Sequence, residues 1–301
     1  MFEGFESFEV ETSTEWGDAV IRGRVGGPAN APPVLLLHGY PQTHAMWHLA
    51  APVLADEYRV VCADLRGYGR SSKPPTTDDH APYSKRAMAA DMVQVMRSLG
   101  HERFHIGAHD RGARVAHRLA TDHPDAVRSM ALLDIAPTRE MYANTTLEFA
   151  KLYWHWFWLT LPAPQPERMI EADAEAFWRF KCTQGYASGP AGTALFAPDA
   201  FADYLACWTP ETIHASCEDY RAAATIDITH DDADGDRRID TPLLVLWGAN
   251  GAIERCFDCL ALWRRRATNV AGHSLPGGHY LAEELPDPVA AAFLQHFKDN
   301  A

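Results

Sequence analysis

The sequence has too few basic residues for a protein that binds nucleic acid. Lysine and arginine number 27 against 40 aspartates and glutamates, which gives the 301-residue chain a formal charge of -13 at pH 7. A surface of this sign repels the phosphates of nucleic acids and the headgroups of anionic membranes. We therefore expect no nucleic acid and no membrane as a partner, and a small anionic substrate would need a local reversal of sign.

Long apolar segments are also missing. No uninterrupted run of uncharged apolar residues is long enough to span a bilayer. The first residues, MFEGFESFEV, are acidic and lack the basic start and apolar stretch of a signal peptide. These features predict a soluble, cytoplasmic protein.

Cysteines and acidic clusters do not form a recognisable metal site. Six cysteines are too few for a disulfide scaffold in a chain of this size, and the CxxC of Cys256 and Cys259 has neither a second pair nor a nearby histidine. The acidic loop at 230–240 places His230 at the first ligand position of a calcium loop and Thr241 at the twelfth, which requires glutamate. We expect no metal and no other cofactor.

Short apolar runs alternate with helical patterns along most of the chain. Each run is rich in valine, leucine and isoleucine and is bounded by turn residues, as strands buried on both faces are. Strand, helix and strand in this order indicate a parallel sheet. The runs are 32–39, 58–67, 103–110, 127–135 and 242–249.

The alternation stops after the fourth run and resumes only at the fifth. Between them, residues 138–225 are aromatic-rich and helical in pattern. We predict an α/β fold with a mostly parallel central sheet flanked by helices. Its core would consist of 1–137 and 226–301, and 138–225 would form an inserted helical cap.

The stretch GAHDRGARV (107–115) carries the first chemical signal. A small residue, any residue, a reactive residue, any residue and a glycine form the sequence of a nucleophile elbow, which is a sharp turn between a strand and a helix. Asp110 occupies the reactive position, where an esterase carries serine. Aspartate is also a favoured helix N-cap, so this position alone leaves a purely structural role open.

Two further segments favour catalysis. LLLHGYP (35–41) is a strand ending in HGxP, the loop that in α/β-hydrolases donates a backbone N–H to the oxyanion hole. Here that donor is the N–H of Tyr40, and the N–H of Arg111 would be the second. His279 follows a strand-like run and a Gly-Gly loop, where this fold keeps its base, and the nucleophile precedes the histidine as expected.

The acid that orients the histidine has two candidates. Asp134 ends the run at 127–135, although it could instead cap the next helix. The loop after 242–249 has no carboxylate until Glu254. We predict that Asp134 orients His279 and keep Glu254 as the alternative.

A carboxylate nucleophile suits substitution at an sp3 carbon. Asp110 is ionised near neutrality, so it can attack without giving a proton to His279. Attack on a carbon that bears a leaving group forms an alkyl ester, which water activated by neutral His279 then hydrolyses. This chemistry predicts an alkyl halide or an epoxide as substrate, rather than an ester.

Arg111 and Arg114 indicate that the substrate is an anion. They lie three residues apart on the first turn of the helix that follows Asp110, beside the positive end of its dipole. Together they can grip a carboxylate, although either alone could pair with a structural carboxylate. A guanidinium next to the nucleophile is a poor neighbour for a neutral apolar substrate, so the pair favours a short 2-haloacid.

Taken together, the motifs resemble those of the fluoroacetate (haloacetate) dehalogenases of the α/β-hydrolase fold. The likeness runs along nearly the whole chain, and the combination of HDRGxR, YWHW and EDYRA makes it specific. The resemblance implies the catalytic and clamp roles given above, a homodimer and no cofactor. It also implies that three cap residues surround the leaving halide, namely His155, Trp156 and Tyr220, which the sequence pattern alone predicts as packing residues. Tyr40 stands where the family often has phenylalanine.

Three functions remain open. The first is hydrolytic dehalogenation, in which fluoroacetate or chloroacetate gives glycolate and halide through an ester on Asp110. The second is an epoxide hydrolase with the same nucleophile, for which Tyr153 or Tyr220 could supply the ring-opening acid. The third is a ligand-binding α/β-hydrolase homologue without turnover. The arginine pair disfavours the second, and an intact set of Asp110, Asp134 and His279 disfavours the third.

Overall fold

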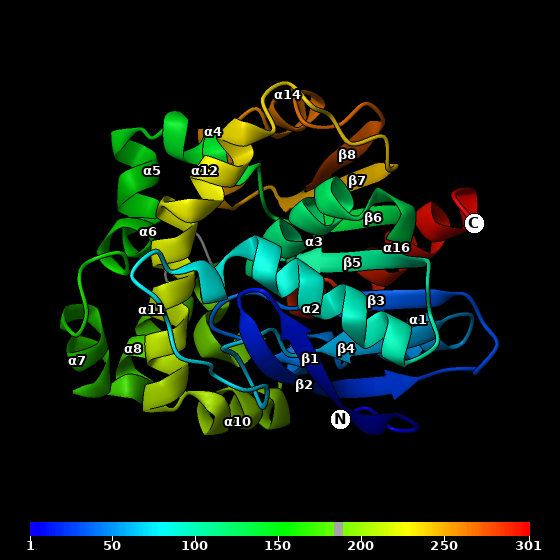
Figure 1. Ribbon diagram of the computed structural model, residues 1–301, viewed down its shortest axis with the longest axis horizontal. Helices are drawn as coiled ribbons and strands as arrows, with labels where there is room; N and C mark the ends of the chain where they lie inside the picture. Colours follow the sequence, from blue (N-terminus) through cyan, green and yellow to red (C-terminus); the bar gives the residue numbers. More distant parts are fainter. Residues whose placement is uncertain (184–188) are drawn as a thin grey trace.

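One sheet of eight strands forms the centre of the computed structural model, which describes residues 1–183 and 189–301 (Figure 1). The strands are β1 (Glu6–Thr14), β2 (Gly17–Gly26), β3 (Pro33–Leu37), β4 (Arg59–Ala63), β5 (Phe104–His109), β6 (Val127–Leu133), β7 (Leu243–Gly248) and β8 (Val270–Leu275). Their order in the sheet is β1-β2-β4-β3-β5-β6-β7-β8. The pairs β1–β2 and β2–β4 are antiparallel and the others are parallel, which confirms the predicted mostly parallel sheet.

Helices outside the segment between β6 and β7 cover both faces of this sheet. They are α1 (Ala50–Ala55), α2 (Lys85–Ser98), α3 (Asp110–Asp122), α13 (Ala252–Cys256), α14 (Cys259–Arg264), α15 (Leu281–Glu284) and α16 (Pro286–Asp299), with the short 3-10 helices η1 (His44–Trp47), η2 (Ala81–Tyr83) and η3 (Pro124–Ala126). In Figure 1, α2 and α3 pack in front of the sheet, while α1 and α16 pack together behind it. Helices on both faces are what a buried parallel sheet requires.

A second group of helices connects β6 to β7. They are α4 (Thr138–Ala143), α5 (Leu147–Leu152), α6 (Trp154–Trp158), α7 (Gln165–Glu171), α8 (Ala174–Cys182), η4 (Gly189–Leu195), α10 (Pro198–Cys207), α11 (Pro210–Ala224) and α12 (Ile226–Ala233). Most of them gather at one end of the sheet (Figure 1). The division into a core of 1–137 and 226–301 and a cap of 138–225 stays a prediction. In the described part of the chain, every helix is too short or too polar to cross a bilayer.

The five apolar runs of the sequence form β3 to β7. Residues Val34 to Leu37 of β3 show why, because all four side chains are fully buried between the two helix layers. The hairpin of β1 and β2 was not predicted. Its strands alternate buried and exposed residues. The many glutamates and arginines at the exposed positions interrupt the apolar residues, so the sequence shows no continuous apolar run there.

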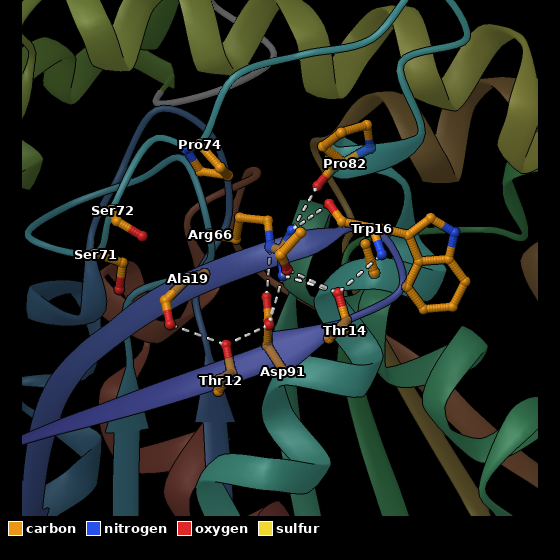
Figure 2. A network of polar contacts seen from close by, with 12 residues as sticks. Thr12, Thr14, Trp16, Ala19, Arg66, Ser71, Ser72, Pro74, Pro82 and Asp91 are labelled. Carbon is orange, nitrogen blue, oxygen red and sulfur yellow. Dashed lines mark hydrogen bonds and ion pairs between the residues drawn. The ribbon is translucent and has the colours of Figure 1, made fainter.

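A buried arginine ties this hairpin to the rest of the molecule (Figure 2). The Arg66 guanidinium, fully shielded from solvent, binds both carboxylate oxygens of Asp91 on α2 at 2.7 Å. Its other N–H groups reach the carbonyls of Trp16 and Gly17 in the β1–β2 turn, at 3.2 and 3.1 Å. The Thr12 hydroxyl of β1 donates to Asp91 at 2.6 Å. One cation therefore joins three segments that are distant in sequence.

Replacing Arg66 with methionine should destabilise the protein strongly. The change leaves the Asp91 carboxylate buried without its cation, and breaking one side of a buried ion pair costs about 3–5 kcal/mol in the free energy of unfolding. Urea unfolding at neutral pH measures the loss. The double variant Arg66→Met, Asp91→Leu serves as the control, because it removes the stranded charge and should recover part of the stability. Equal stability of the single variant and the parent would contradict the network.

Candidate active site

The residue predicted as nucleophile lies in a sharp turn between β5 and α3. Asp110 is the first residue of α3, has a left-handed φ of 43° and is only 3% exposed. A Cβ on Gly39 would lie 2.7 Å from the Asp110 Cβ, and a Cβ on Gly112 would lie 2.5 Å from the His38 carbonyl oxygen. Only glycine therefore permits this close approach of loop, helix and strand. The geometry is that of a nucleophile elbow.

The charge on Asp110 is supported by its neighbours. Burial alone would raise the pKa of this carboxyl, but the neighbouring His279 and Arg114, followed by His109 and Arg111, hold it below its ordinary value. The Tyr40 backbone N–H, predicted for the oxyanion hole, donates to Oδ2 of Asp110 at 3.2 Å. At neutral pH the side chain is therefore an ionised carboxylate next to a backbone donor.

Asp134 and His279 meet beside this turn. Nδ1 of His279 donates to Oδ2 of Asp134 at 2.6 Å, and the Gly248 N–H donates to the other carboxylate oxygen at 2.9 Å. The alternative acid, Glu254, is exposed and instead accepts a hydrogen bond from the indole of Trp247. The structure thus brings Asp134 to the histidine and leaves Glu254 away from it. Because Nδ1 carries the proton, Nε2 of His279 remains free to accept one.

A second histidine, which sequence patterns did not single out, supports the first. His109 ends β5, and its Nε2–H donates to the backbone carbonyl of His279 at 2.9 Å. Burial, and then the neighbouring charge of His279, lower the pKa of His109 to about 3, so the ring is neutral. Its ring centroid lies 4.6 Å from that of His279. The residue directly before the nucleophile therefore positions the loop that carries the predicted base.

Each arginine of the predicted clamp is bound along one edge and free along another. Nε and Nη2 of Arg111 bind the carboxylate of Asp219 on α11 at 2.8 and 2.7 Å, and Nη1 of Arg114 binds the Ala136 carbonyl and the Thr138 hydroxyl at 3.1 and 3.0 Å. Nη1 of Arg111 and Nε of Arg114 are buried without a hydrogen-bond partner in the described part of the chain. Two guanidinium groups thus keep unused donors in the interior.

Asp219 is a further residue that sequence patterns did not single out, although it lies in the EDYRA stretch. Besides Arg111, its carboxylate accepts from the Tyr68 hydroxyl at 2.6 Å and from the ammonium of Lys85 at the start of α2. Burial would raise the pKa of Asp219, but Arg111 and Lys85 hold it well below its usual range. The Asp219 carboxylate lies between two cations. Its single negative charge is shared by Arg111 and Lys85, so it does not fully neutralise Arg111.

The three residues implied as halide ligands also have unused donors. Nδ1 of His155, Nε1 of Trp156 and the hydroxyl of Tyr220 are buried without a hydrogen-bond partner among the described residues. Burial lowers the pKa of His155 well below its ordinary value, so the ring is neutral and carries one N–H. Buried polar groups in native proteins nearly always find a partner, so several unsatisfied donors in one region mark a place for water or a polar ligand.

These donors lie beside the arginines. The Arg111 guanidinium stacks over the Tyr220 ring at 4.2 Å, and that of Arg114 over the Trp156 ring at 4.5 Å. The rings of His155 and Tyr220 are 5.8 Å apart. All five side chains are almost completely buried. The region therefore combines positive charge with neutral donors.

Comparisons with known proteins agree with this geometry. A family model described as alpha/beta hydrolase fold matches residues 32–286. The chain is 46% identical over 300 residues to a fluoroacetate dehalogenase from Burkholderia sp, covering 99% of this chain and 96% of that protein. It is 29% identical over 269 residues to a soluble epoxide hydrolase from Corynebacterium sp. (strain C12), covering 88% and 90%. The crystal structure of ALR0039 from Nostoc sp PCC 7120, assigned to the alpha/beta hydrolases, superposes with a TM-score of 0.92 at 50% identity and covers 99% of both chains.

Proposed function

This chain belongs to the α/β-hydrolase family and is a relative of fluoroacetate dehalogenase, and from that premise we propose that it hydrolyses the carbon–halogen bond of short 2-haloacids. Fluoroacetate or chloroacetate and water would give glycolate, halide and a proton. One observation carries the proposal. The buried carboxylate of Asp110 lies in a site with unused donors on two arginines and on three neutral side chains. This is the donor set that a substrate carboxylate and a departing halide need.

In the first step, Arg111 and Arg114 hold the substrate carboxylate through their free N–H groups. Oδ of Asp110 attacks C2 from the side opposite the halogen, which forms an ester and releases halide. Donors from His155, Trp156 and Tyr220 stabilise the negative charge that develops on the halogen. This help matters most for fluoride, which is a poor leaving group from carbon.

In the second step, water attacks the carbonyl carbon of the Asp110 ester. His279 takes the proton from this water through Nε2 while Asp134 holds its Nδ1–H. The backbone N–H groups of Tyr40 and Arg111 stabilise the oxyanion, and its collapse releases glycolate and restores the Asp110 carboxylate. No metal or other cofactor enters these steps.

Two alternatives remain for comparison. The sequence identity to a soluble epoxide hydrolase favours ring opening of an epoxide. Tyr153 lies near the predicted base, because the ring centroids of Tyr153 and His279 are 6.3 Å apart. The unused donors of Arg111 and Arg114 argue against it, because a neutral epoxide brings no anion to the free N–H groups of these two buried guanidinium groups. A homologue without turnover would have no need for the 2.6 Å contact between Asp134 and His279.

Assays of halide release and of epoxide hydrolysis separate these functions. Release of fluoride from fluoroacetate, or of chloride from chloroacetate, supports the dehalogenase. Hydrolysis of styrene oxide without halide release from either acid supports the epoxide hydrolase, and inactivity with all three compounds supports a binding protein. Assembly as a homodimer and a cytoplasmic location stay part of the proposal, and light scattering of the purified chain tests the former.

Replacing Arg114 with alanine should weaken turnover of haloacids with little loss of stability. The hydrogen bonds of Arg114 go to neutral acceptors, so its removal leaves no carboxylate without a hydrogen-bond partner, whereas removal of Arg111 leaves Asp219 with fewer partners. We expect kcat/KM for chloroacetate to fall by roughly 10²-fold or more, because a charge-assisted contact in a buried site is lost. Neutral chloroacetamide is the control substrate and should lose much less. Equal losses for both compounds would show that Arg114 does not recognise the carboxylate.

A further inference from the structure

Lys181 is a buried cation that the mechanism above does not use. It lies in the last turn of α8 and is only 2% exposed. Its ammonium sits over the ring of Tyr40, with Nζ 5.5 Å from the ring centroid. In residues 1–183 and 189–301, no hydrogen bond or ion pair of this ammonium is found. Burying an ammonium away from water costs free energy unless an anion pairs with it.

Two other buried cations near the site are paired with carboxylates of the protein. Lys85 binds Asp219 and lies 3.6 Å from a carboxylate oxygen of Asp227. Arg111 shares Asp219 with Lys85. Both of these cations therefore have a carboxylate from the protein, which Lys181 lacks. An anionic ligand could supply it.

The position of Lys181 relative to the clamp limits what that ligand can be. The Tyr40 ring stacks on His155, with centroids 6.2 Å apart, and Arg111 and Arg114 lie against Tyr220 and Trp156. Lys181 contacts the Tyr40 ring, whereas Arg111 contacts the neighbouring Tyr220 ring, whose centroid lies 5.2 Å from that of Tyr40. Lys181 and the two arginines thus lie against different rings, Tyr40 for the lysine and Tyr220 and Trp156 for the clamp. A ligand that reaches both must carry two separated negative groups.

The hydroxyl of Tyr40, on the ring that Lys181 contacts, is a second unused donor. It is fully buried and has no hydrogen-bond partner in the described part of the chain. Burial, followed by the nearby Cys217 and Cys182, raises the pKa of this hydroxyl well above its ordinary value, so it keeps its proton. Phenylalanine at this position would offer no donor.

We propose that Lys181, with the Tyr40 hydroxyl beside it, forms a second anion subsite that binds the far carboxylate of a 2-halodicarboxylate such as 2-chlorosuccinate. This inference rests on the proposed dehalogenase function and extends its substrate class. Arg111 and Arg114 hold the carboxylate next to the reacting carbon. Asp110 then displaces chloride from C2, and hydrolysis of the ester gives a 2-hydroxydicarboxylate, chloride and a proton.

Chloride release from two substrates of equal chain length tests the subsite. 2-Chlorosuccinate has the second carboxylate, and 2-chlorobutyrate has a methyl group in its place. The parent should favour 2-chlorosuccinate in kcat/KM by about tenfold or more, because a charge-assisted contact forms in a buried site. Lys181→Met, which keeps the length of the side chain without its charge, should lose this preference. Tyr40→Phe should reduce the preference less, and Lys298→Met, on the exposed end of α16, is the matched control that should keep it.

Two results would overturn the subsite while leaving the proposed function intact. One is a parent that releases chloride from chloroacetate but does not prefer 2-chlorosuccinate. The other is a Lys181→Met variant in which both four-carbon substrates lose activity equally. Absence of chloride release from all substrates would count against the proposed function instead. Calorimetry with succinate and butyrate then decides the subsite, since tighter binding of succinate that Lys181→Met abolishes supports it and equal binding contradicts it.

Discussion

Replacing His279 with alanine should stop the enzyme after one halide per site. Asp110 needs no base for its attack, because a carboxylate is ionised near neutrality and Arg114 and Arg111 remain beside it in the variant. Hydrolysis of the ester does need one, and His279, which binds Asp134 at 2.6 Å, is the proposed base. Halide release should therefore begin as in the parent and cease when every Asp110 is esterified. Steady-state turnover should fall by about 10²–10⁴-fold, the usual contribution of a general base.

Intact-protein mass spectrometry detects the trapped ester directly. After reaction with chloroacetate, the variant should gain one carboxymethyl group, and peptide mapping should place it on Asp110. The parent, treated in the same way, is the control and should return to its original mass. Repeated halide release by the variant at the rate of the parent would show that His279 is not the base.

Replacing Asp110 with asparagine should abolish halide release altogether. Asparagine is close in size to aspartate and tolerates the left-handed φ of 43° better than most residues, so the turn should survive. Its amide is not a nucleophile of comparable strength, and we expect kcat/KM to fall by about 10⁴-fold or more. No ester should form. Thermal unfolding close to that of the parent would establish that the fold is intact.

The same variant should bind the substrate more tightly. In the parent, the Asp110 carboxylate repels the carboxylate of the incoming acid, and asparagine removes this repulsion while Arg111 and Arg114 remain. Calorimetry with acetate, which has no leaving group, should therefore give a lower Kd for Asp110→Asn than for the parent. Halide release from Asp110→Asn at a rate near that of the parent would require a different nucleophile.

The sequence predicts those parts of the site that depend on local geometry. An elbow motif after an apolar strand places Asp110, and the order of loops around a parallel sheet places Asp134 and His279 at the same edge. The choice between Asp134 and Glu254 needed the three-dimensional structure, because it depends on which side chain reaches His279. Their catalytic roles stay predictions that the variants above test.

Other parts depend on contacts between distant segments. Only the family resemblance proposed the halide ligands His155, Trp156 and Tyr220, because an aromatic stretch is equally typical of residues that pack in a hydrophobic core. The Asp219 carboxylate reaches Arg111 from another helix, and no spacing in the sequence indicates this pairing. The same holds for Lys181 over Tyr40.

A single turnover in heavy-oxygen water tests the covalent role of Asp110 most directly. With enzyme in excess over fluoroacetate, the first glycolate should carry ordinary oxygen taken from the Asp110 carboxylate, and the heavy isotope should appear in that side chain. Mass spectrometry of the product and of the peptide that contains Asp110 detects the oxygen isotope in each. Heavy oxygen in the first glycolate, with none in the protein, would mean that water attacks the substrate carbon directly and would contradict the ester mechanism.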